Sequence, residues 1–417
     1  MAALKENASY RRDHILGFPG SLLDRRVFHD APFLESSPFL SCFQENPNHI
    51  GCHSMAQSES AFGGTQSLEM DLLQICAEEI LGASADSWDG YVASGGTEAN
   101  IQALWINRNY YLEKPKTKSN EIAVLHSEDT HYSVSKGCDL LGLRNIPLKV
   151  DETSRQILCQ EIISEVQKAQ NEGTKFFIVV LNMGTTMFGS VDKIAPLIQI
   201  LDQMQANYRI HVDAAFGGFI YTFMNPDNEL SFKNGKIVSF ALDAHKMLQA
   251  PYGTGIFLVR KGNMEHVCTE TATYVRGNDY TLCGSRSGAN AVAAWMILRS
   301  YGSEGGKRFL KRIIRFTDHL CQGLDDLGVS YFRDPFMNIV TLRAEAIPKS
   351  LARRFWLVPD NHEHPTRWKI VVMDHFTRQI LDKFLEELRT TTGVCFGESS
   401  LGVKKGKNRI AKSCHIF

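Results

Sequence analysis

Short apolar runs alternate with stretches of helical spacing through the central part of the chain. Seven such runs lie between about residues 90 and 262: GYVAS (90–94), IAVLHS (122–127), NIPLKV (145–150), FFIVVLN (176–182), RIHVDA (209–214), IVSFAL (237–242) and GIFLVR (255–260). Most are followed by a helical pattern, and continuous apolar runs of this kind are typical of strands buried on both faces. The pattern predicts an α/β fold with a sheet of seven mostly parallel strands.

The segments on either side of this sheet show different patterns. The first 65 residues are rich in Pro, Asn, Ser and Phe without a sustained period, which indicates an arm that packs on another part of the molecule. After residue 300, helical patterns over 304–327 and 375–389, with strand-like runs between them, indicate a smaller α+β domain. We therefore predict an arm (1–65), a large domain (66–300), a small C-terminal domain (301–395) and a basic tail (396–417).

Composition narrows the class of protein. The 417 residues are 43% hydrophobic and 22% charged, with a formal net charge of −1, so no global field favours nucleic acid or an anionic membrane. The sequence shows no signal-type apolar segment and no run long enough to span a membrane, and its ten scattered cysteines form no CxxC pair or zinc-type cluster. We expect a cytoplasmic protein that acts on a small molecule.

A glycine-rich turn follows the first predicted strand. Ser94-Gly95-Gly96-Thr97-Glu98-Ala99-Asn100 leads directly into a helical run. Backbone N–H groups freed by the glycines, the Thr97 hydroxyl and the positive end of the helix can together hold a phosphate. The sequence lacks the GKS/T of a Walker loop and the spacing of a dinucleotide motif, which favours a single phosphate. A tight turn capped by Thr97 is the alternative interpretation.

Two ionisable residues lie at the ends of neighbouring predicted strands. Asp213 is followed by small residues that let a flat ring approach, and a carboxylate there can keep a pyridine nitrogen protonated. A metal ligand or a helix cap is the alternative for Asp213. Lys246 follows the next apolar run, and we expect burial of its amine to favour the neutral form that makes a Schiff base. Both side chains can then face one ring.

These motifs, taken in order, resemble a known family. SGGTEAN, Thr130-His131-Tyr132-Ser133, HVDAA and His245-Lys246 resemble the group II pyridoxal-phosphate-dependent amino-acid decarboxylases, in particular the bacterial histidine and archaeal tyrosine/aspartate branch. The resemblance covers about residues 65 to 300. It implies the aspartate-aminotransferase-like type I fold, pyridoxal 5′-phosphate as the cofactor, and release of the α-carboxylate of an L-amino acid as CO2.

The resemblance also implies roles for individual residues. The catalytic roles fall on a Schiff-base lysine, a histidine that stacks on the ring and a carboxylate that pairs with its nitrogen: Lys246, His131 and Asp213. Ala215 would cover the ring face opposite His131, and the phosphate would be held by Gly96, Thr97 and His245. Thr186 would reach the phenolic oxygen or the substrate carboxylate, although the adjacent Thr185 is also able to donate a hydrogen bond.

The turn near residue 285 implies an assembly. In Gly284-Ser285-Arg286-Ser287, the resemblance implies that Ser285 reaches the phosphate of a neighbouring subunit, and hence a homodimer with shared active sites. Arg286 is either an anchor of this turn or a substrate ligand. In relatives, a tyrosine just before this turn protonates the substrate carbon after CO2 leaves. Neither Tyr274 nor Tyr280 can be aligned with that tyrosine.

Other reaction classes stay open from the sequence. A carbon–carbon lyase of the sphingosine-1-phosphate lyase type would share every cofactor residue, and an aminotransferase or a cysteine desulfurase-type enzyme would differ in its product. A non-catalytic binding protein is disfavoured because Lys246 and Asp213 are both intact. The arm residues His49, His53 and Gln57 are candidates for the substrate pocket, but the sequence does not identify the amino acid.

Overall fold

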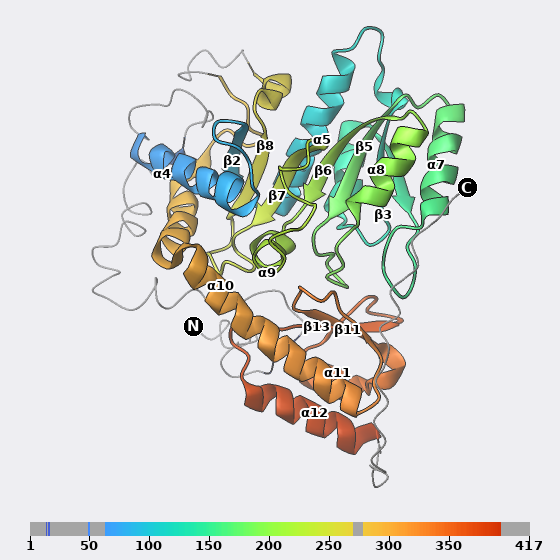
Figure 1. Ribbon diagram of the computed structural model, residues 1–417, viewed down its shortest axis with the longest axis vertical. Coiled ribbons are helices and arrows are strands. Elements are labelled where there is room, and N and C mark those ends of the chain that lie inside the picture. Colours follow the sequence, from blue (N-terminus) through green and yellow to red (C-terminus); the bar gives the residue numbers. More distant parts are fainter. Residues whose placement is uncertain (1–13, 15, 17–48, 51–62, 270–277, 393–417) are drawn as a thin grey trace.

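A seven-stranded sheet forms the centre of the large domain, in the order β2-β8-β7-β6-β5-β3-β4 (Figure 1). The computed structural model describes residues 14, 16, 49–50, 63–269 and 278–392, and the statements below concern these residues. The strands are β2 (Trp88–Ala93), β3 (Ile122–Ser127), β4 (Arg144–Leu148), β5 (Phe176–Asn182), β6 (Asn207–Asp213), β7 (Ile237–Asp243) and β8 (Gly255–Arg260). Each of the seven apolar runs therefore forms a strand of one sheet.

The direction of the strands brings their functional ends to one edge of the sheet. β8 runs antiparallel to both β2 and β7, and the other neighbours are parallel. In register, Asn182 of β5 lies beside Asp213 of β6, while Asp243 at the end of β7 pairs with Gly255. A Cβ on Gly255 would lie 2.5 Å from the Cα of Gly95, so this glycine lets the turn after β2 close onto β8.

Helices cover both faces of the sheet. Val124 of β3 belongs to an apolar cluster that includes residues of α5 (Gly96–Leu112) and α6 (Ser133–Leu141). Its neighbour Leu125 belongs to the main apolar cluster, which includes residues of α7 (Cys159–Asn171) and α8 (Ile194–Gln203). Because successive side chains of a strand point to opposite faces, both sides of the sheet are buried, as the continuous apolar runs require.

Shorter elements complete the large domain. α4 (Gly63–Gln74) continues into a π-helical segment, η2 (Ile75–Ile80), and a short helix, α9 (Tyr221–Met224), follows β6. The 3-10 turns are η3 (Ser119–Glu121), η4 (Gly217–Phe219) and η5 (Asn263–Val267).

A second, smaller sheet forms the C-terminal domain, in the order β10-β11-β13-β12 with antiparallel pairs. Its elements are β10 (Tyr331–Phe332), β11 (Ile339–Arg343), η6 (Ala344–Ala346), α11 (Lys349–Arg354), β12 (Val358–Pro359), β13 (Arg367–Val371) and α12 (Arg378–Thr392). The sequence patterns anticipated β10, β11, β13 and α12 but missed the short α11 and β12.

One long helix joins the two domains. α10 (Gly288–Asp326) packs on α4 at its start and on α12 and β11 of the small domain further along (Figure 1). Gly302 interrupts it with φ 58° and ψ 179°, so α10 consists of two helical segments. The expected domain boundary between residues 300 and 301 falls next to this break and stays a prediction.

Described parts of the arm contact the folded domains. Leu16 is fully buried, its N–H donates to the carbonyl of Phe355, and its carbonyl accepts from the N–H of Val371. β1 (His49–Ile50) pairs antiparallel with β9 (Arg286–Ser287). The basic tail expected over 396–417 lies outside the described residues.

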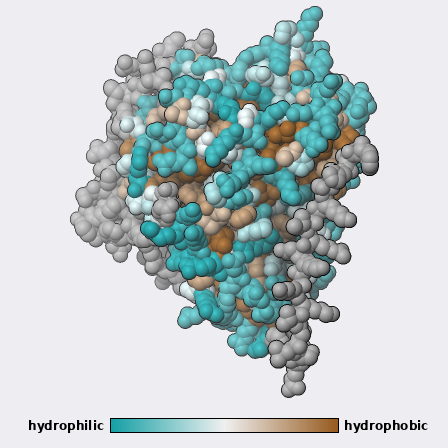
Figure 2. All heavy atoms as spheres, viewed as in Figure 1, coloured by the Kyte–Doolittle hydropathy of each residue, from teal (hydrophilic) through white to brown (hydrophobic). Residues whose placement is uncertain are grey.

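Among the described residues on the face in Figure 2, hydrophilic ones cover most of the surface, with hydrophobic patches between them. No helix in the described part of the chain has the length and apolar character needed to cross a membrane.

Candidate active site

The strand ends enclose a cavity of about 330 Å³ at the edge where β2, β5, β6 and β7 terminate. Most of the residues expected from the sequence line it, namely Gly96, Thr97, His131, Thr186, Asp213, Ala215, His245 and Lys246. They come from five separate segments of the chain, which the sheet order brings together. Its volume is that of a small-molecule site.

The candidate Schiff-base lysine has a carboxylate partner. Lys246 Nζ lies 2.9 Å from Asp243 Oδ2, and its side chain is 26% exposed. The sequence predicted a buried amine, whereas the structure leaves this side chain partly exposed and places the Asp243 carboxylate against it. His245 Nε2 lies 3.5 Å from the same carboxylate oxygen, and burial lowers the pKa of His245.

The glycine-rich turn leaves the N-terminus of α5 open toward the cavity. α5 begins at Gly96, its N-cap is Gly95, and no side chain caps it, so Thr97 does not act as the cap that the alternative interpretation required. A Cβ on Gly96 would lie 3.0 Å from both Ala215 Cβ and Asp243 Oδ2. The helix N–H groups at this turn therefore remain available to an anion.

Asp213 is buried and held from two sides. Its Oδ2 accepts a hydrogen bond from Asn100 Nδ2 at 2.8 Å, and its Oδ1 accepts from the N–H of Ala215 at 3.1 Å. The described residues contain no group of three His, Cys, Asp or Glu side chains that could hold a metal, so the metal-ligand alternative for Asp213 has no partner residues there.

His131 lines the cavity from the segment before α6. Its Nδ1 lies 2.8 Å from the hydroxyl of Ser133, and its ring packs against that of Tyr132 at 4.2 Å between centroids. Burial is the main cause that lowers the pKa of His131; nearby Asp213 acts in the opposite direction.

The two adjacent threonines have different environments. Thr185 is buried and its Oγ1 lies 2.7 Å from Ser190 Oγ, so its hydroxyl is engaged within the loop. Thr186 lines the cavity, and its carbonyl accepts a hydrogen bond of 3.0 Å from Lys369 Nζ. Both threonines line the cavity, but the Thr185 hydroxyl is engaged by Ser190, so Thr186 is the better placed of the two to reach a ligand.

Sequence reasoning missed Lys369. This lysine of β13 is 3% exposed, and burial lowers the pKa of its amine to about 8, with a further contribution from the Lys246 charge. No carboxylate in the described part of the chain pairs with it. A lysine inside the apolar run WKIVVM was the available signal. A buried cation of this kind needs an anion to compensate it.

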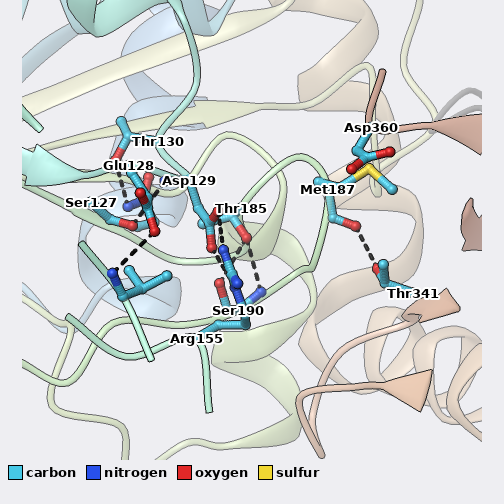
Figure 3. A network of polar contacts seen from close by, with 12 residues as sticks. Ser127, Glu128, Asp129, Thr130, Arg155, Thr185, Met187, Ser190, Thr341 and Asp360 are labelled. Carbon is cyan, nitrogen blue, oxygen red and sulfur yellow. Dashed lines mark hydrogen bonds and ion pairs between the residues drawn. The ribbon is translucent and has the colours of Figure 1, made fainter. Parts of the chain in front are cut away.

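Lys369 lines a second cleft, which shares His131, Tyr132 and Thr186 with the first cavity. Figure 3 shows the polar contacts that shape this region. Arg155 pairs with Asp129 through two hydrogen bonds, and Thr341 of β11 donates to the carbonyl of Met187 at 2.6 Å. The second contact ties the small domain to the loop that carries Thr186.

The comparisons identify the family. A model described as the pyridoxal-dependent decarboxylase conserved domain matches residues 48–332. A tryptophan decarboxylase from Clostridium sporogenes is 45% identical over 389 residues, which cover 93% of this chain and 93% of the relative. A probable L-aspartate decarboxylase from Archaeoglobus fulgidus is 32% identical over 79% of this chain and 85% of the relative. This chain belongs to the pyridoxal-dependent decarboxylases.

Solved structures agree on the fold of this decarboxylase. L-methionine decarboxylase from Streptomyces sp. 590 matches with a TM-score of 0.73 at 21% identity, over 93% of this chain and 94% of that one. Oryza sativa TDC with PLP and tryptamine matches with a TM-score of 0.78 at 15% identity, over 94% and 86%. The type I fold expected from the sequence is confirmed, as are pyridoxal phosphate and amino-acid decarboxylation. The alternatives, a carbon–carbon lyase of the sphingosine-1-phosphate lyase type and an aminotransferase, are not better supported than decarboxylation.

The cavity of the decarboxylase fits its cofactor. Asp243 Oδ1 and His245 Nδ1 are buried beside the glycine-rich turn, and neither has a hydrogen-bond partner among the described residues. An amine, a buried carboxylate and an open helix N-terminus are the groups that an aldehyde, a pyridine nitrogen and a phosphate require. The individual roles of these residues stay proposals.

The residues near position 285 to which the resemblance gave roles do not line this cavity. Arg286 is buried and forms an ion pair with Glu69, which identifies it as the anchor of the turn rather than a substrate ligand. Ser285 is exposed and does not line the cavity of its own chain. Tyr280 is partly buried, and its carbonyl accepts a hydrogen bond from Gln102. Tyr274, His53, Gln57 and the side chain of His49 lie outside what the structure describes.

Proposed function

We propose that this decarboxylase acts on an aromatic L-amino acid, with L-tryptophan as the first candidate. The reaction rests on one observation: Lys246 and Asp213, at the ends of neighbouring strands, line the same cavity. The substrate class rests on the 45% identity to a tryptophan decarboxylase over nearly the whole of both chains.

The cavity residues have separate roles in the proposed reaction. Bound pyridoxal phosphate supplies a sink for the electron pair that the departing CO2 leaves on the substrate Cα. In the proposal Lys246 holds the cofactor covalently, and Asp213 keeps its ring nitrogen protonated. Gly96, Thr97 and His245 hold the phosphate, while His131 and Ala215 cover the two faces of the ring. Fixed geometry and fixed charges then lower the barrier.

Lys369 is the proposed anchor for the substrate carboxylate. Its ammonium donates to the carbonyl of Thr186, a residue that lines both clefts, and lacks a carboxylate partner among the described residues. A cation that holds a carboxylate stabilises the bound substrate more than the emerging neutral CO2, so we assign Lys369 to binding and orientation rather than to rate acceleration. Thr186, whose carbonyl holds Lys369, would contact the cofactor or the same carboxylate.

We further propose a homodimer with shared active sites, working in the cytoplasm. Exposed residues lie on the segments next to the cavity: Tyr252 is 74% exposed and stacks on the His245 ring, and Leu282 is 41% exposed near Ser285. A second subunit would cover them and bring its Ser285 to the phosphate. The free cysteines of the described residues, such as Cys76 and Cys138, favour a reducing compartment.

A substrate screen tests the proposed function. Each of the twenty amino acids is supplied to the holoenzyme, and released CO2 and the amine product are measured. We expect tryptophan to give the highest kcat/KM, with tyrosine or phenylalanine next. Aspartate as the best substrate would overturn the aromatic class and favour the specificity named for the archaeal relatives. Keto acid without CO2 would overturn decarboxylation itself.

A further inference from the structure

A chain of hydrogen bonds connects six side chains at the cavity, with Asn100 at its centre. Asn100 is 1% exposed on the second turn of α5. Its Nδ2 lies 2.8 Å from Asp213 Oδ2 and 2.9 Å from Ser133 Oγ, and its Oδ1 lies 2.9 Å from His211 Nε2. His211 Nδ1 lies 2.8 Å from Ser239 Oγ. One amide therefore contacts β6 twice and the start of α6 once.

The orientation of the Asn100 amide follows from its partners. A carboxylate is only an acceptor, so the Asn100 atom that faces Asp213 must be the NH2 group. The opposite orientation would place two oxygens 2.8 Å apart. With the NH2 group on Asp213 and Ser133, the Asn100 oxygen faces His211 and accepts from its Nε2–H.

The tautomer of His211 is then fixed. Complete burial lowers the pKa of His211 to about 4, so the ring is neutral. Because Nε2 carries its one hydrogen, Nδ1 accepts from the Ser239 hydroxyl. His211 cannot change its protonation near neutral pH, so it holds the Asn100 amide in one orientation.

The other branch of the network fixes His131. Ser133 Oγ accepts one N–H of Asn100, so its own hydrogen is directed to His131 Nδ1 at 2.8 Å. The backbone N–H of Ser133 also points at this nitrogen, at 3.3 Å. With two donors on Nδ1, the hydrogen of the neutral ring must be on Nε2.

We propose that Asn100 is a positioning residue that aims the Asp213 carboxylate and, through Ser133, fixes the Nε2–H tautomer of His131. One amide thereby joins the two groups that the proposed function places at the ring nitrogen and on the ring face. The inference rests on the proposed function for what the two groups do. The His131 tautomer can be measured independently of that function, because it exists before any cofactor binds.

The test compares two buried asparagines of the same helix. Asn100→Leu removes the network, and Asn107→Leu removes a fully buried amide that contacts Ala103 and Arg209 away from the cavity. Nitrogen-15 NMR of the imidazole rings in the cofactor-free protein reports the tautomer of His131. We expect one Nε2–H form in the native chain and in Asn107→Leu, and a mixture of tautomers in Asn100→Leu. Pyridoxal phosphate affinity should fall about ten- to a hundredfold in Asn100→Leu only, because that variant loses a hydrogen bond to the charged Asp213.

A second variant keeps the test decisive if Asn100→Leu does not fold. Ser133→Ala removes the hydroxyl that contacts His131 Nδ1 at 2.8 Å and leaves only the longer backbone contact at 3.3 Å, so we expect a measurable Nδ1–H population of His131 with cofactor affinity within about threefold of native. A His131 ring that keeps its Nε2–H form in Ser133→Ala would overturn the relay. Cofactor affinities that are equal in Asn100→Leu and Asn107→Leu would overturn the role toward Asp213. Failure of the proposed substrate class would leave both readouts unchanged.

Discussion

Lys246 Nζ lies 2.9 Å from Asp243 Oδ2, so the candidate Schiff-base lysine forms an ion pair with the carboxylate that ends β7. An amine must lose a proton before it attacks an aldehyde, and this ion pair opposes that loss because a carboxylate stabilises the charged form of the amine beside it, here at Asp243. Its second oxygen, Oδ1, has no hydrogen-bond partner among the described residues. The pair therefore bears directly on how the cofactor is loaded.

We predict that Asp243→Asn speeds covalent loading of pyridoxal phosphate several-fold at pH 7, because the ammonium loses the anion that stabilises it. The measurement is the rise of the Schiff-base absorbance after the cofactor is mixed with cofactor-free protein. Borohydride reduction followed by peptide mapping should place the adduct on Lys246 in both proteins. An adduct on another lysine would contradict the site, and an unchanged rate at pH 7 would contradict the role of Asp243.

Local sequence patterns predicted the strands and the residues at their ends because both are local properties. Each apolar run shows which segment is buried, and residues just after parallel strands meet at one edge. The partners of those residues are not local. Asn100 and His211 are 111 positions apart, and Thr186 and Lys369 are 183 apart. Their contacts depend on the sheet order and on the docking of the small domain, which apolar runs do not encode.

The carboxylate partner of Lys246 was missed for a related reason. Sequence alone indicated that the amine follows a buried strand, but the side chain that faces it depends on the turn after β7. No specific role could be assigned to Asp243 from the sequence, because a strand-end carboxylate has many uses.

Asp213→Asn should keep the cofactor but lose turnover. The amide leaves the pyridine nitrogen without an anionic partner, so the electron sink weakens. We expect kcat to fall at least about a hundredfold, roughly 2.7 kcal/mol at 1.36 kcal/mol per decade. Asp89→Asn, a buried carboxylate that binds the N–H of Gly262 away from the cavity, is the control and should retain activity. Near-normal turnover of Asp213→Asn would rule out the pyridinium role.

Lys369→Met should weaken substrate binding and stabilise the fold. Loss of the ammonium removes the proposed carboxylate anchor, so KM should rise about tenfold with a smaller change in kcat. Native KM should also rise above pH 8, where the amine, with its pKa lowered from 10.5 to about 8, loses its charge.

The stability effect of Lys369 has a defined sign. Below pH 8 the folded chain holds a buried charge at a cost, on the order of 1–3 kcal/mol. Between about pH 8 and 10.5 the folded chain loses the proton first, so this group makes the native protein more stable as pH rises. The free energy of unfolding, measured with urea, should rise over this pH range in the native chain and in the exposed control Lys193→Met. It should not show this rise in Lys369→Met. Equal slopes in all three would contradict the assignment.

Arg286 should prove structural. Its ion pair with Glu69 is buried, and the Val92 backbone bonds to both partners, so Arg286→Met leaves a carboxylate buried without its cation. We expect a loss of about 3–5 kcal/mol in the free energy of unfolding. The double variant Glu69→Leu with Arg286→Met should recover most of it. Arg299→Met breaks an exposed pair with Asp71 and should cost under about 1 kcal/mol. Similar losses in the two single variants would show that burial is not the cause.

Assembly and cofactor binding should depend on each other. If Ser285 of one subunit closes the phosphate site of its partner, pyridoxal phosphate must strengthen the dimer, and the dimer must strengthen cofactor affinity by the same factor. Sedimentation at several protein concentrations, with and without the cofactor, measures both effects. Ser285→Ala should weaken both, whereas Ser330→Ala, an exposed serine of the small domain, should change neither. Because Ser285 does not line the cavity of its own chain, a loss of cofactor affinity in Ser285→Ala has to act through the second subunit. A stable monomer that binds the cofactor tightly would exclude the shared site and leave the Lys246 assignment intact.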